Sequence, residues 1–262
     1  MKDESLTDTL FLSEKRRQIL LYLISGPKTI EEIKENLHSK SSPIMVQIRI
    51  LIRSHLVMEK NGMYELTGLG KSTVFEMVSI LDMFSVFDSC PDYWTDVDLE
   101  AFPTHLLNRI GELGQMDLYV PDRAHIFDCS RQVFEELKDA GSVIEISSIF
   151  RKTYVKDYVS VAEKGFNVTF VLSNEVLERI ENEFPEIYYR YMRLDNVRFF
   201  IAPEMKMASC LITDKFVSLS LLTKDGKFFN HDLVSRNKNA INWGIDLFYH
   251  YRALSKIHQL QE

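Results

Sequence analysis

The sequence predicts a multi-domain α+β protein, in which an N-terminal winged helix-turn-helix precedes an α/β domain with a mixed sheet. In residues 29–67, two short amphipathic helical patterns and a turn are followed by an Asn-Gly hairpin. After residue 116, strand-like and helical segments alternate. The 262 residues, 45% of them hydrophobic, suffice for two ordinary cores. We therefore expect a winged domain at 1–70, connecting helices at 71–115 and an α/β domain at 116–262.

Apolar spacing and capping residues predict the first two helices. Residues 14–25 repeat apolar side chains at helical spacing and end before a Gly-Pro pair. Thr29 and Glu32 then form the pattern of a capping box, in which each residue satisfies a free amide of the helix start. A second helix therefore begins after Thr29, and a turn follows it at 38–41.

A third helix at 42–53 is the element that we expect in the major groove of DNA. Ser41 or Ser42 can cap it, with Pro43 in its first turn, where a missing amide hydrogen costs little. One side carries the apolar residues Ile44, Ile48 and Leu51, and the opposite side carries Ser42, Val46, Arg49 and Arg53. The candidate DNA-binding residues of this helix and of the wing are Ser42, Met45, Val46, Gln47, Arg49, Arg53 and Lys60.

The predicted wing covers residues 57–67. Its two strands flank Asn61 and Gly62, a dipeptide that readily adopts the positive φ angles of a tight hairpin turn. Lys60 lies at the tip, where a wing can follow a phosphate backbone. A helical hairpin followed by an unrelated hairpin would look similar, but the order and short spacing of the parts favour the winged unit. Some winged helices bind protein or RNA instead of DNA.

Charge is divided unevenly along the chain. The net charge is −7 and the isoelectric point is about 5.6, whereas nonspecific affinity for phosphates comes from Lys and Arg. Residues 14–71 nevertheless hold 10 Lys and Arg against 6 Asp and Glu, and the remainder holds 21 against 32. The local excess favours double-stranded DNA as a partner of the N-terminal part. Val46 and Ile50 can contact thymine methyl groups, or alternatively another domain or subunit.

A helix from the Thr67-Gly68 turn to about Phe87 connects the two domains. Its apolar stripe consists of Val74, Met77, Val78, Leu81 and Phe84. This helix, or the segment after it, can pair with its copy, which would give a homodimer and symmetric DNA half-sites. Alternatively, the helix packs only on its own winged domain. We expect residues 90–115 to form a connector that packs between the domains.

The remaining segments predict the α/β domain. Strands are expected at 118–120, 142–150, 167–172, 197–201, 208–213 and 216–222, and helices at 123–139, at 154–164, after Ser173 and at 239–257. The helix at 154–164 joins two strands and favours parallel pairing. The last two strands, separated by Asp214-Lys215, are expected to form a hairpin. Gly244 would allow the final helix to approach the core closely.

Several classes of protein are disfavoured by what the sequence lacks. Cys90, Cys129 and Cys210 are widely spaced and contain no CxxC pair, so neither a disulfide framework nor a zinc site is indicated. No cofactor is predicted. The N-terminus does not resemble a signal peptide, and no run of about 18 apolar residues is present. We therefore expect a cytoplasmic protein that does not enter the membrane.

Short stretches in both halves carry a resemblance to a known family. They are Ser41-Ser42-Pro43-Ile44, Gln47-Ile48, residues 64–71, residues 110–113, Gly226-Lys227-Phe228, and residues 240–244 with Leu247, Phe248 and Tyr251. In this order, the chain resembles archaeal regulators, many from methanogens, that join an ArsR-like or MarR-like winged helix to the middle domain named after the methanogen filamentation regulator. The resemblance implies transcriptional regulation in an archaeal cytoplasm and lends no catalytic residues.

No catalytic or metal site is predicted. Related sensor domains of archaeal sugar regulators look like phospholipase D folds, whose enzymes need a His-x-Lys-x4-Asp motif that this chain lacks. A Gly-rich phosphate loop and a G-x-S-x-G elbow are also missing. His231 and Asp232 are the nearest pair that could ligate a metal, but no further ligands follow at a plausible spacing. We interpret them as loop residues.

A small anionic effector is the predicted ligand of the α/β domain. Ligands of open α/β sheets lie beyond the carboxyl ends of strands. Two such ends carry Arg151 and Lys152, and Ser173 and Asn174, where the amides of a new helix favour an anion. In the alternative interpretation, Arg151 and Lys152 are solvated residues at a helix start and Ser173 is a plain helix cap.

Taken together, these features predict a sequence-specific, homodimeric DNA-binding transcriptional regulator. The helix at 42–53 and the wing at 57–67 would contact double-stranded DNA, and the C-terminal domain would sense a small effector. The alternative is a small α/β enzyme, or a protein-interaction module, that uses the winged helix as an interaction arm.

Overall fold

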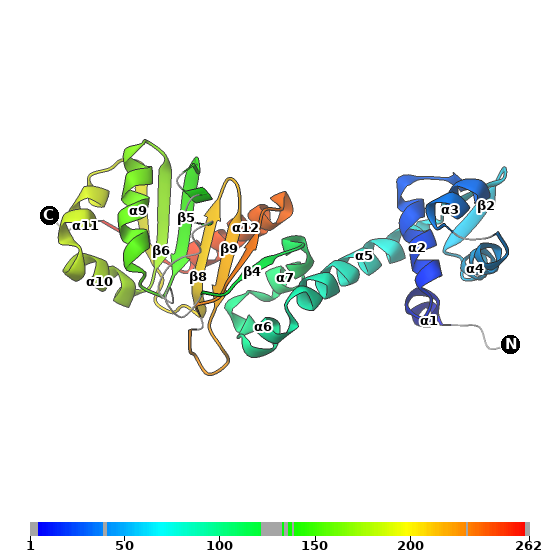
Figure 1. Cartoon of the computed structure of the whole chain (residues 1–262), viewed down its shortest axis with the longest axis horizontal. Helices are drawn as coiled ribbons and strands as arrows, with labels where there is room; N and C mark the ends of the chain where they lie inside the picture. The colour runs from blue at the N-terminus through cyan, green and yellow to red at the C-terminus, as the bar shows by residue number, and fades with distance from the viewer. Residues whose placement is uncertain are drawn as a thin grey trace. The chain divides into compact units, whose positions relative to one another are not determined.

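The computed structural model describes residues 5–38, 41–121, 133, 136–137, 139–228 and 230–259. The chain forms two compact units, Met1–Leu81 and Asp82–Glu262, and Figure 1 labels most of their helices and several of their strands. We refer to them as unit 1 and unit 2. Helix α5 (Gly68–Ser89) begins in unit 1 and ends in unit 2.

Unit 1 combines short helices with a small antiparallel sheet. Before α5, its elements are α1 (Leu6–Phe11), α2 (Glu14–Tyr22), the 3-10 helix η1 (Leu23–Ser25), β1 (Lys28–Thr29), α3 (Ile30–Asn36), α4 (Ser41–Arg53), β2 (Val57–Lys60) and β3 (Met63–Leu66). The three strands are ordered β1-β3-β2. The three predicted helices and the hairpin are all present in the expected order.

Local chemistry explains where these elements begin and turn. The Thr29 hydroxyl accepts a hydrogen bond from the Glu32 amide, and the Glu32 carboxylate accepts one from the Thr29 amide at 2.7 Å. At the wing tip, Asn61 and Gly62 have φ angles of 55° and 78°. Both values are positive, as a hairpin turn of the predicted type requires. The capping box and the hairpin turn are therefore confirmed.

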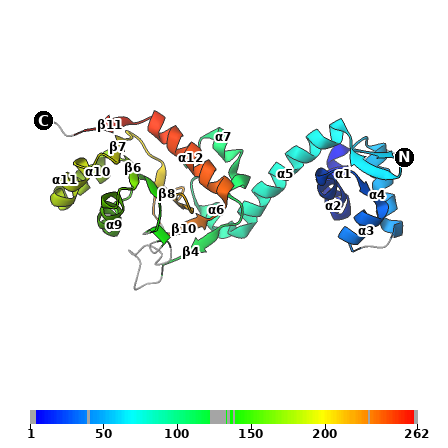
Figure 2. The same ribbon diagram turned by 90° about the horizontal axis from the view of Figure 1, so that it is seen from above.

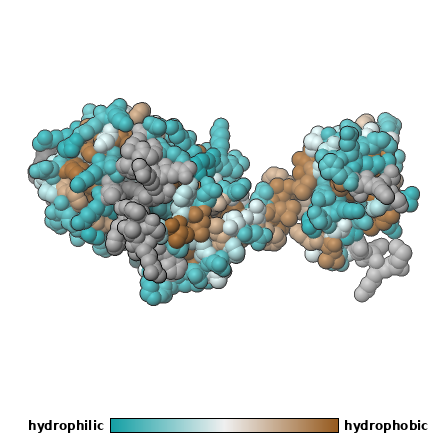
Figure 3. Space-filling view, in the orientation of Figure 1, coloured by the Kyte–Doolittle hydropathy of each residue, from teal (hydrophilic) through white to brown (hydrophobic). Residues whose placement is uncertain are grey.

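The core of unit 1 lies between α2, α3, α4 and the first turns of α5. Ile19, Ile33 and Leu56 have no exposed surface in this core. A Cβ atom at Gly70 would lie 2.0 Å from the Leu56 carbonyl oxygen, so only glycine allows α5 to approach the residue before β2 this closely. Figure 3 shows hydrophobic surface along α5.

Unit 2 is built around one large sheet. Its elements are α6 (Pro91–Asp96), η2 (Leu99–Ala101), α7 (Thr104–Leu107), η3 (Ile110–Leu113), β4 (Asp117–Tyr119), β5 (Ser142–Ser147), α9 (Lys152–Glu163), β6 (Asn167–Leu172), α10 (Asn174–Glu183), α11 (Pro185–Met192), β7 (Val197–Ile201), β8 (Met207–Thr213), β9 (Val217–Leu221), β10 (Asp232–Ser235), α12 (Lys238–Ala253) and β11 (Lys256–His258). The eight strands are ordered β11-β7-β6-β5-β8-β9-β10-β4. Strands β5, β6 and β7 are parallel, and all other pairs are antiparallel. The mixed sheet expected from the sequence is therefore present.

Helices cover both faces of this sheet, and each face has its own core. Helix α12 packs on one face, and α9, α10 and α11 pack on the other (Figure 2). Gly244 lets α12 approach the sheet closely, because a Cβ atom there would lie 3.1 Å from the side chains of Ile212 and Val217. Side chains that alternate along each strand therefore contribute to different cores.

Two of the predicted segments differ from the sequence-based expectations, and a third is largely untested. The final helix was expected to reach residue 257 but ends at Ala253, and Lys256–His258 instead pairs with β7 as strand β11. The strand expected at 142–150 ends at Ser147, because the residues after it leave the sheet toward α9. Most of the helix expected at 123–139 lies outside the described residues.

Candidate nucleic-acid interface

Helix α4 buries one side in unit 1 and exposes the other. Ile44 and Ile48 have no exposed surface, whereas Val46 is 50% exposed. Arg49 and Arg53 are exposed as well. Since residues four apart share one side of a helix, the two guanidinium groups follow one another along this outer side. The Arg53 Nε atom also donates a hydrogen bond of 3.4 Å to the Arg49 carbonyl oxygen.

Two other predicted DNA-binding residues of α4 contact neighbouring parts of unit 1. The Met45 sulfur lies 4.0 Å from the Tyr64 hydroxyl, which donates to it. Gln47 accepts a hydrogen bond of 3.5 Å from the Ser13 hydroxyl, between α1 and α2. Both are half-buried, so their contacts hold α4 in place within the unit. Ser42 lies in the first turn of α4, and its side chain is outside the described part of the structure.

The wing exposes one cation between two methionines. Lys60 is exposed and pairs across the hairpin with Met63, which is 41% exposed. Met58 is 43% exposed and shares a face of β2 with Lys60, because alternate residues of a strand point the same way. This face can approach a phosphate through the Lys60 ammonium group, and it can also contact apolar groups.

Some basic residues of unit 1 serve its own structure. Arg16 is 4% exposed, and its Nη2 atom donates to the Asp8 carbonyl oxygen at 3.1 Å. Arg17 donates to the Phe11 carbonyl oxygen at 2.7 Å. Both contacts hold α1 against α2. The positive charge that α4 and the wing present at their exposed surfaces therefore comes from Arg49, Arg53 and Lys60.

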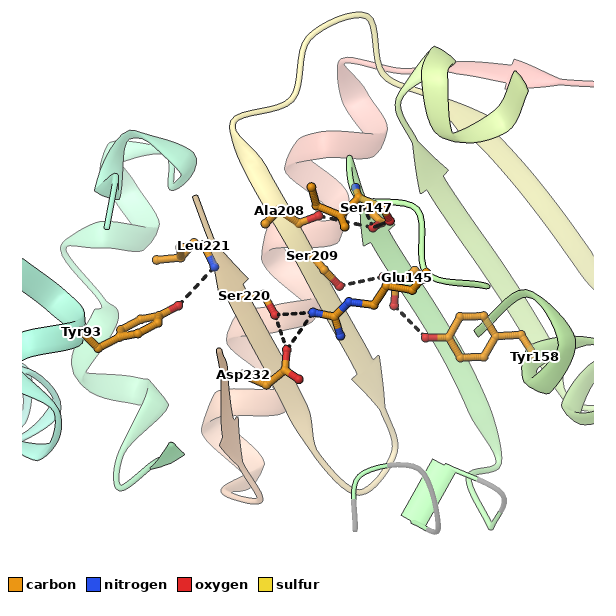
Figure 4. A network of polar contacts seen from close by, with 11 residues as sticks. Tyr93, Glu145, Ser147, Tyr158, Ala208, Ser209, Ser220, Leu221 and Asp232 are labelled. Atoms are coloured by element: carbon orange, nitrogen blue, oxygen red, sulfur yellow. Dashed lines mark hydrogen bonds and ion pairs between the residues drawn. The ribbon is translucent and has the colours of Figure 1, made fainter. Parts of the chain in front are cut away.

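A buried polar network lies on the sheet of unit 2 (Figure 4). The Glu145 carboxylate on β5 accepts hydrogen bonds from the Ser209 hydroxyl at 2.8 Å and from the Tyr158 hydroxyl at 2.9 Å. Burial raises the pKa of Glu145 from 4.5 to about 7, although these two hydrogen bonds and the positive charge of Arg151 act in the opposite direction. Glu145 therefore exchanges its proton near neutral pH.

Arg151 extends the same network to β9 and β10. Its Nη2 atom lies 3.1 Å from an Asp232 carboxylate oxygen and 3.2 Å from the Ser220 hydroxyl. Ser220 also donates a hydrogen bond to Asp232 (Figure 4). The side chains of Arg151 and Asp232 are 8% and 6% exposed. The Phe228 ring faces the guanidinium group with its centroid at 5.3 Å. A buried ion pair of this kind connects the loop after β5 to the opposite half of the sheet.

A small cavity adjoins this network. Its volume is about 30 Å³, and Glu145, Arg151 and Tyr158 contribute to its lining together with apolar side chains of α9, β6 and α10. This space is comparable to the volume of roughly one water molecule. In this conformation, the cavity does not admit a metabolite.

The residues predicted to bind an anionic effector are engaged in separate local contacts. Arg151 is paired with Asp232, as described above. Lys152 is exposed and lies 3.6 Å from Glu183. Ser173 is buried and caps α10 by accepting a hydrogen bond from the Val176 amide. Asn174 is the exposed first residue of that helix. The described contacts do not unite these four side chains around one pocket, and the anionic effector stays a prediction.

His231 and Asp232 have different surroundings, and the interpretation of both as loop residues is wrong for Asp232, which is buried at the start of β10. Asp232 binds Arg151, whereas the His231 ring lies 6.4 Å from the Tyr93 ring, and partial burial lowers the His231 pKa. Across the described residues, no group of three or more His, Cys, Asp and Glu side chains could hold a metal ion. The helices in that same part of the chain also include none that combines the length and apolar character needed to cross a membrane.

Glu145 was not among the site residues predicted from the sequence, although a signal for it was present. A single carboxylate stands in the strand Ser142–Ser147, at a position where alternation places a core side chain. Its partners come from positions 158 and 209, and no local pattern links such distant positions. Identifying them required the parallel pairing of β5 with β6 and the antiparallel pairing of β5 with β8.

Comparison with known proteins identifies both halves of the chain. Residues 5–85 match the N-terminal domain of the methanogenesis regulatory protein FilR1, and residues 126–254 match the middle domain of the same protein. A relative named methanogenesis regulatory protein FilR1, from Methanothrix harundinacea (strain 6Ac), is 22% identical over 251 residues. This match covers 93% of the chain but only 56% of the relative.

Two of the solved structures that are similar to the chain have low sequence identity and TM-scores below 0.5. TrmBL2, described as an archaeal chromatin protein, has 12% identity and a TM-score of 0.44, with 93% of this chain and 94% of that chain covered. The phospholipase D family member Nuc from Salmonella typhimurium has 13% identity and a TM-score of 0.38, with 56% of this chain and 100% of that chain covered. The two domain matches follow one another and together account for most of the sequence, so the chain belongs to the FilR1 family of methanogenesis regulatory proteins.

Proposed function

We propose that this protein is a DNA-binding transcriptional regulator, in which α4 enters the major groove and the wing follows the adjacent backbone. The observation that carries the proposal is the exposure of Arg49 and Arg53 along the outer side of α4. Membership of a family of regulatory proteins supports it. The local excess of basic residues in residues 14–71 supplies the attraction to phosphates that the acidic remainder lacks.

Sequence preference in this proposal comes from two kinds of contact. Arg49 and Arg53 can donate two hydrogen bonds each to guanine, and the exposed Val46 side chain can contact a thymine methyl group. Lys60 of the wing contributes attraction to phosphate that does not depend on the base sequence. Met45 and Gln47 act indirectly, since their contacts set the position of α4.

A gel-shift assay with the DNA upstream of the protein's own gene tests the proposal. The Arg49→Ala/Arg53→Ala variant is compared with the wild type at two salt concentrations. Wild-type binding should weaken as salt rises, and the variant should lose most of its affinity, with about 1–3 kcal/mol lost for each arginine that contacts a base. The plot of log affinity against log salt should also become less steep, by roughly 0.9 in slope for each lost phosphate contact.

A variant with the same change in charge serves as the control. Lys15→Ala/Lys34→Ala removes two cations of unit 1 that lie on α2 and α3. It should bind DNA nearly as the wild type does. Equal binding by the α4 variant and the wild type would refute the assignment of α4. Equal losses in both variants would show that only the total charge of unit 1 matters.

The proposal extends to the organisation of the whole protein. We propose three parts: a winged domain at 1–70, connecting and dimerising helices at 71–115, of which residues 82–115 fold within unit 2, and an effector-sensing or assembly domain at 116–262. Two copies would place two reading helices on symmetric half-sites. The protein would act in the cytoplasm, and a small anion remains the predicted effector.

A protein-interaction arm is the second candidate function. Val46, Met58 and Met63 expose apolar surface on α4 and the wing, and such surface suits a protein partner as well as DNA. In that case, the Arg49→Ala/Arg53→Ala variant and the wild type would show the same weak DNA binding. Val46→Glu would then abolish capture of the partner.

A further inference from the structure

Unit 1 contains an apolar groove next to the first turns of α5. Its volume is about 350 Å³. The lining residues include Ile24, Glu65, Lys71, Val74, Phe75 and Val78. Most of these side chains are apolar, and the two charged ones, Glu65 and Lys71, have opposite signs. None of the lining residues belongs to α4, which we propose for DNA.

Two apolar side chains that line the groove are unusually exposed. Phe75 is 72% exposed and Ile24 is 55% exposed, whereas Val74 and Met77 on α5 are almost completely buried. The apolar stripe of α5 is therefore wider than the surface that unit 1 covers. Contiguous apolar surface of this kind marks an interaction site on many proteins.

The groove and Phe75 suit each other in a symmetric contact. In an association with two-fold symmetry, the same patch is used by both copies, so a projecting side chain must meet a hollow of the same patch. Phe75 projects beside a hollow of about 350 Å³. A protein cavity of about 150 Å³ already accommodates benzene, so the groove has room for a phenyl ring.

The charges of the groove also favour a second copy of this chain. If a two-fold contact places Glu65 beside the partner's Lys71, symmetry also places Lys71 beside the partner's Glu65. Two attractive ion pairs then form, and like charges do not face each other. A patch whose charges all had one sign would oppose such pairing.

We infer that the groove receives Phe75 of a second copy, with reciprocal Glu65–Lys71 pairs at its rim. This inference rests on the proposed homodimer and names its contact surface. Ile24 and Val78 would pack around the inserted ring. All of these residues belong to unit 1, so the contact does not depend on the placement of unit 2.

Sedimentation velocity of the full chain, over a concentration series, tests the inference. Phe75→Glu places a charge in the apolar contact and should weaken dimerisation at least about 30-fold. Leu12→Glu is the matched control, because Leu12 is 75% exposed at the end of α1 and lies outside the groove. It should dimerise as the wild type does.

Charge reversal gives a second test with its own internal control. Glu65→Lys and Lys71→Glu each create two like-charge contacts in a symmetric dimer and should weaken it by about 10-fold. The double variant Glu65→Lys/Lys71→Glu restores both attractive pairs and should return to within about threefold of the wild type. A loss that only accumulates in the double variant would overturn the reciprocal contact.

The outcomes separate this inference from the proposal on which it rests. If the wild type is a dimer and Phe75→Glu is an equal dimer, the groove is not the contact, while the homodimer stands. If the wild type is monomeric throughout the series, both fail. A small apolar ligand as the occupant would be indicated by a monomeric wild type that binds a fluorescent apolar dye which Phe75→Glu does not bind.

Discussion

Replacing Glu145 by Gln should remove most of a specific pH dependence from the stability of unit 2. A glutamine side chain resembles the protonated acid in size, and its amide can still form hydrogen bonds with the Ser209 and Tyr158 hydroxyls. The substitution therefore changes the ability to ionise more than it changes packing. Glu145 is 3% exposed, so solvent does not screen this charge appreciably.

The expected magnitude follows from the raised pKa. Burial raises the Glu145 pKa from 4.5 to about 7. In the folded state the group holds its proton more tightly than in the unfolded state, so stability is fully present below about pH 4.5 and falls as pH rises through about 7. The difference between the two pKa values corresponds to about 3 kcal/mol, most of which lies between about pH 5 and pH 8.

Tryptophan fluorescence makes unit 2 separately observable. Both tryptophans of the chain, Trp94 and Trp243, lie in unit 2 and are buried. Urea unfolding followed by tryptophan emission therefore reports on unit 2 alone, although the protein has two units. The wild type should lose roughly 2–3 kcal/mol relative to Glu145→Gln between about pH 5 and pH 8.

Histidines that titrate in the same range do not confuse this comparison. Burial lowers the pKa values of His231 and His250, so their contribution to stability rises with pH, opposite in sign to that of Glu145. They are present in both proteins and cancel in the difference. Parallel curves of wild type and Glu145→Gln would refute the reasoning, because they would show that Glu145 does not change its protonation on folding.

Two further substitutions test other close contacts. Asp232→Ala leaves the buried Arg151 guanidinium without its carboxylate and should destabilise unit 2 by about 3–5 kcal/mol in the same fluorescence assay, whereas Asp225→Ala, at an exposed ion pair, should change little. Gly70→Ala would place a Cβ atom 2.0 Å from the Leu56 carbonyl oxygen, so α5 must shift. The free energy of unfolding of unit 1, measured by circular dichroism, should therefore fall by about 1–3 kcal/mol. An unchanged free energy of unfolding would show that α5 moves without cost.

The winged unit could be predicted well because its signals are local. A capping box needs only Thr29 and Glu32, three residues apart, and a tight hairpin needs only Asn61 and Gly62 between two strands. The burial of Ile48 likewise follows from helical spacing. Each of these features depends on neighbours along the chain, so a sequence pattern specifies them almost completely.

The last strand could not be predicted in the same way. Residues 239–257 repeat apolar side chains at helical spacing, yet the helix ends at Ala253 and Lys256–His258 pairs with β7. The free edge of β7 offers unpaired amide and carbonyl groups, and the chain returning from α12 satisfies them. This preference depends on the order of strands in the sheet, which helical spacing does not contain.

Arg151 shows the same limit at the candidate effector site. In the sequence, Arg151 stands beside Lys152 at the expected end of a strand, and its local context offers it no partner. This position therefore favoured an anion as the ligand of Arg151. The fold brings Asp232 from β10 to within 3.1 Å, 81 positions further along the chain, and the charge of Arg151 is used inside the protein. A search for the effector should therefore begin with Lys152 and the exposed start of α10. Arg151 would join such a site only if a ligand also displaced it from Asp232, and that exchange would cost the buried pair that connects the two halves of the sheet.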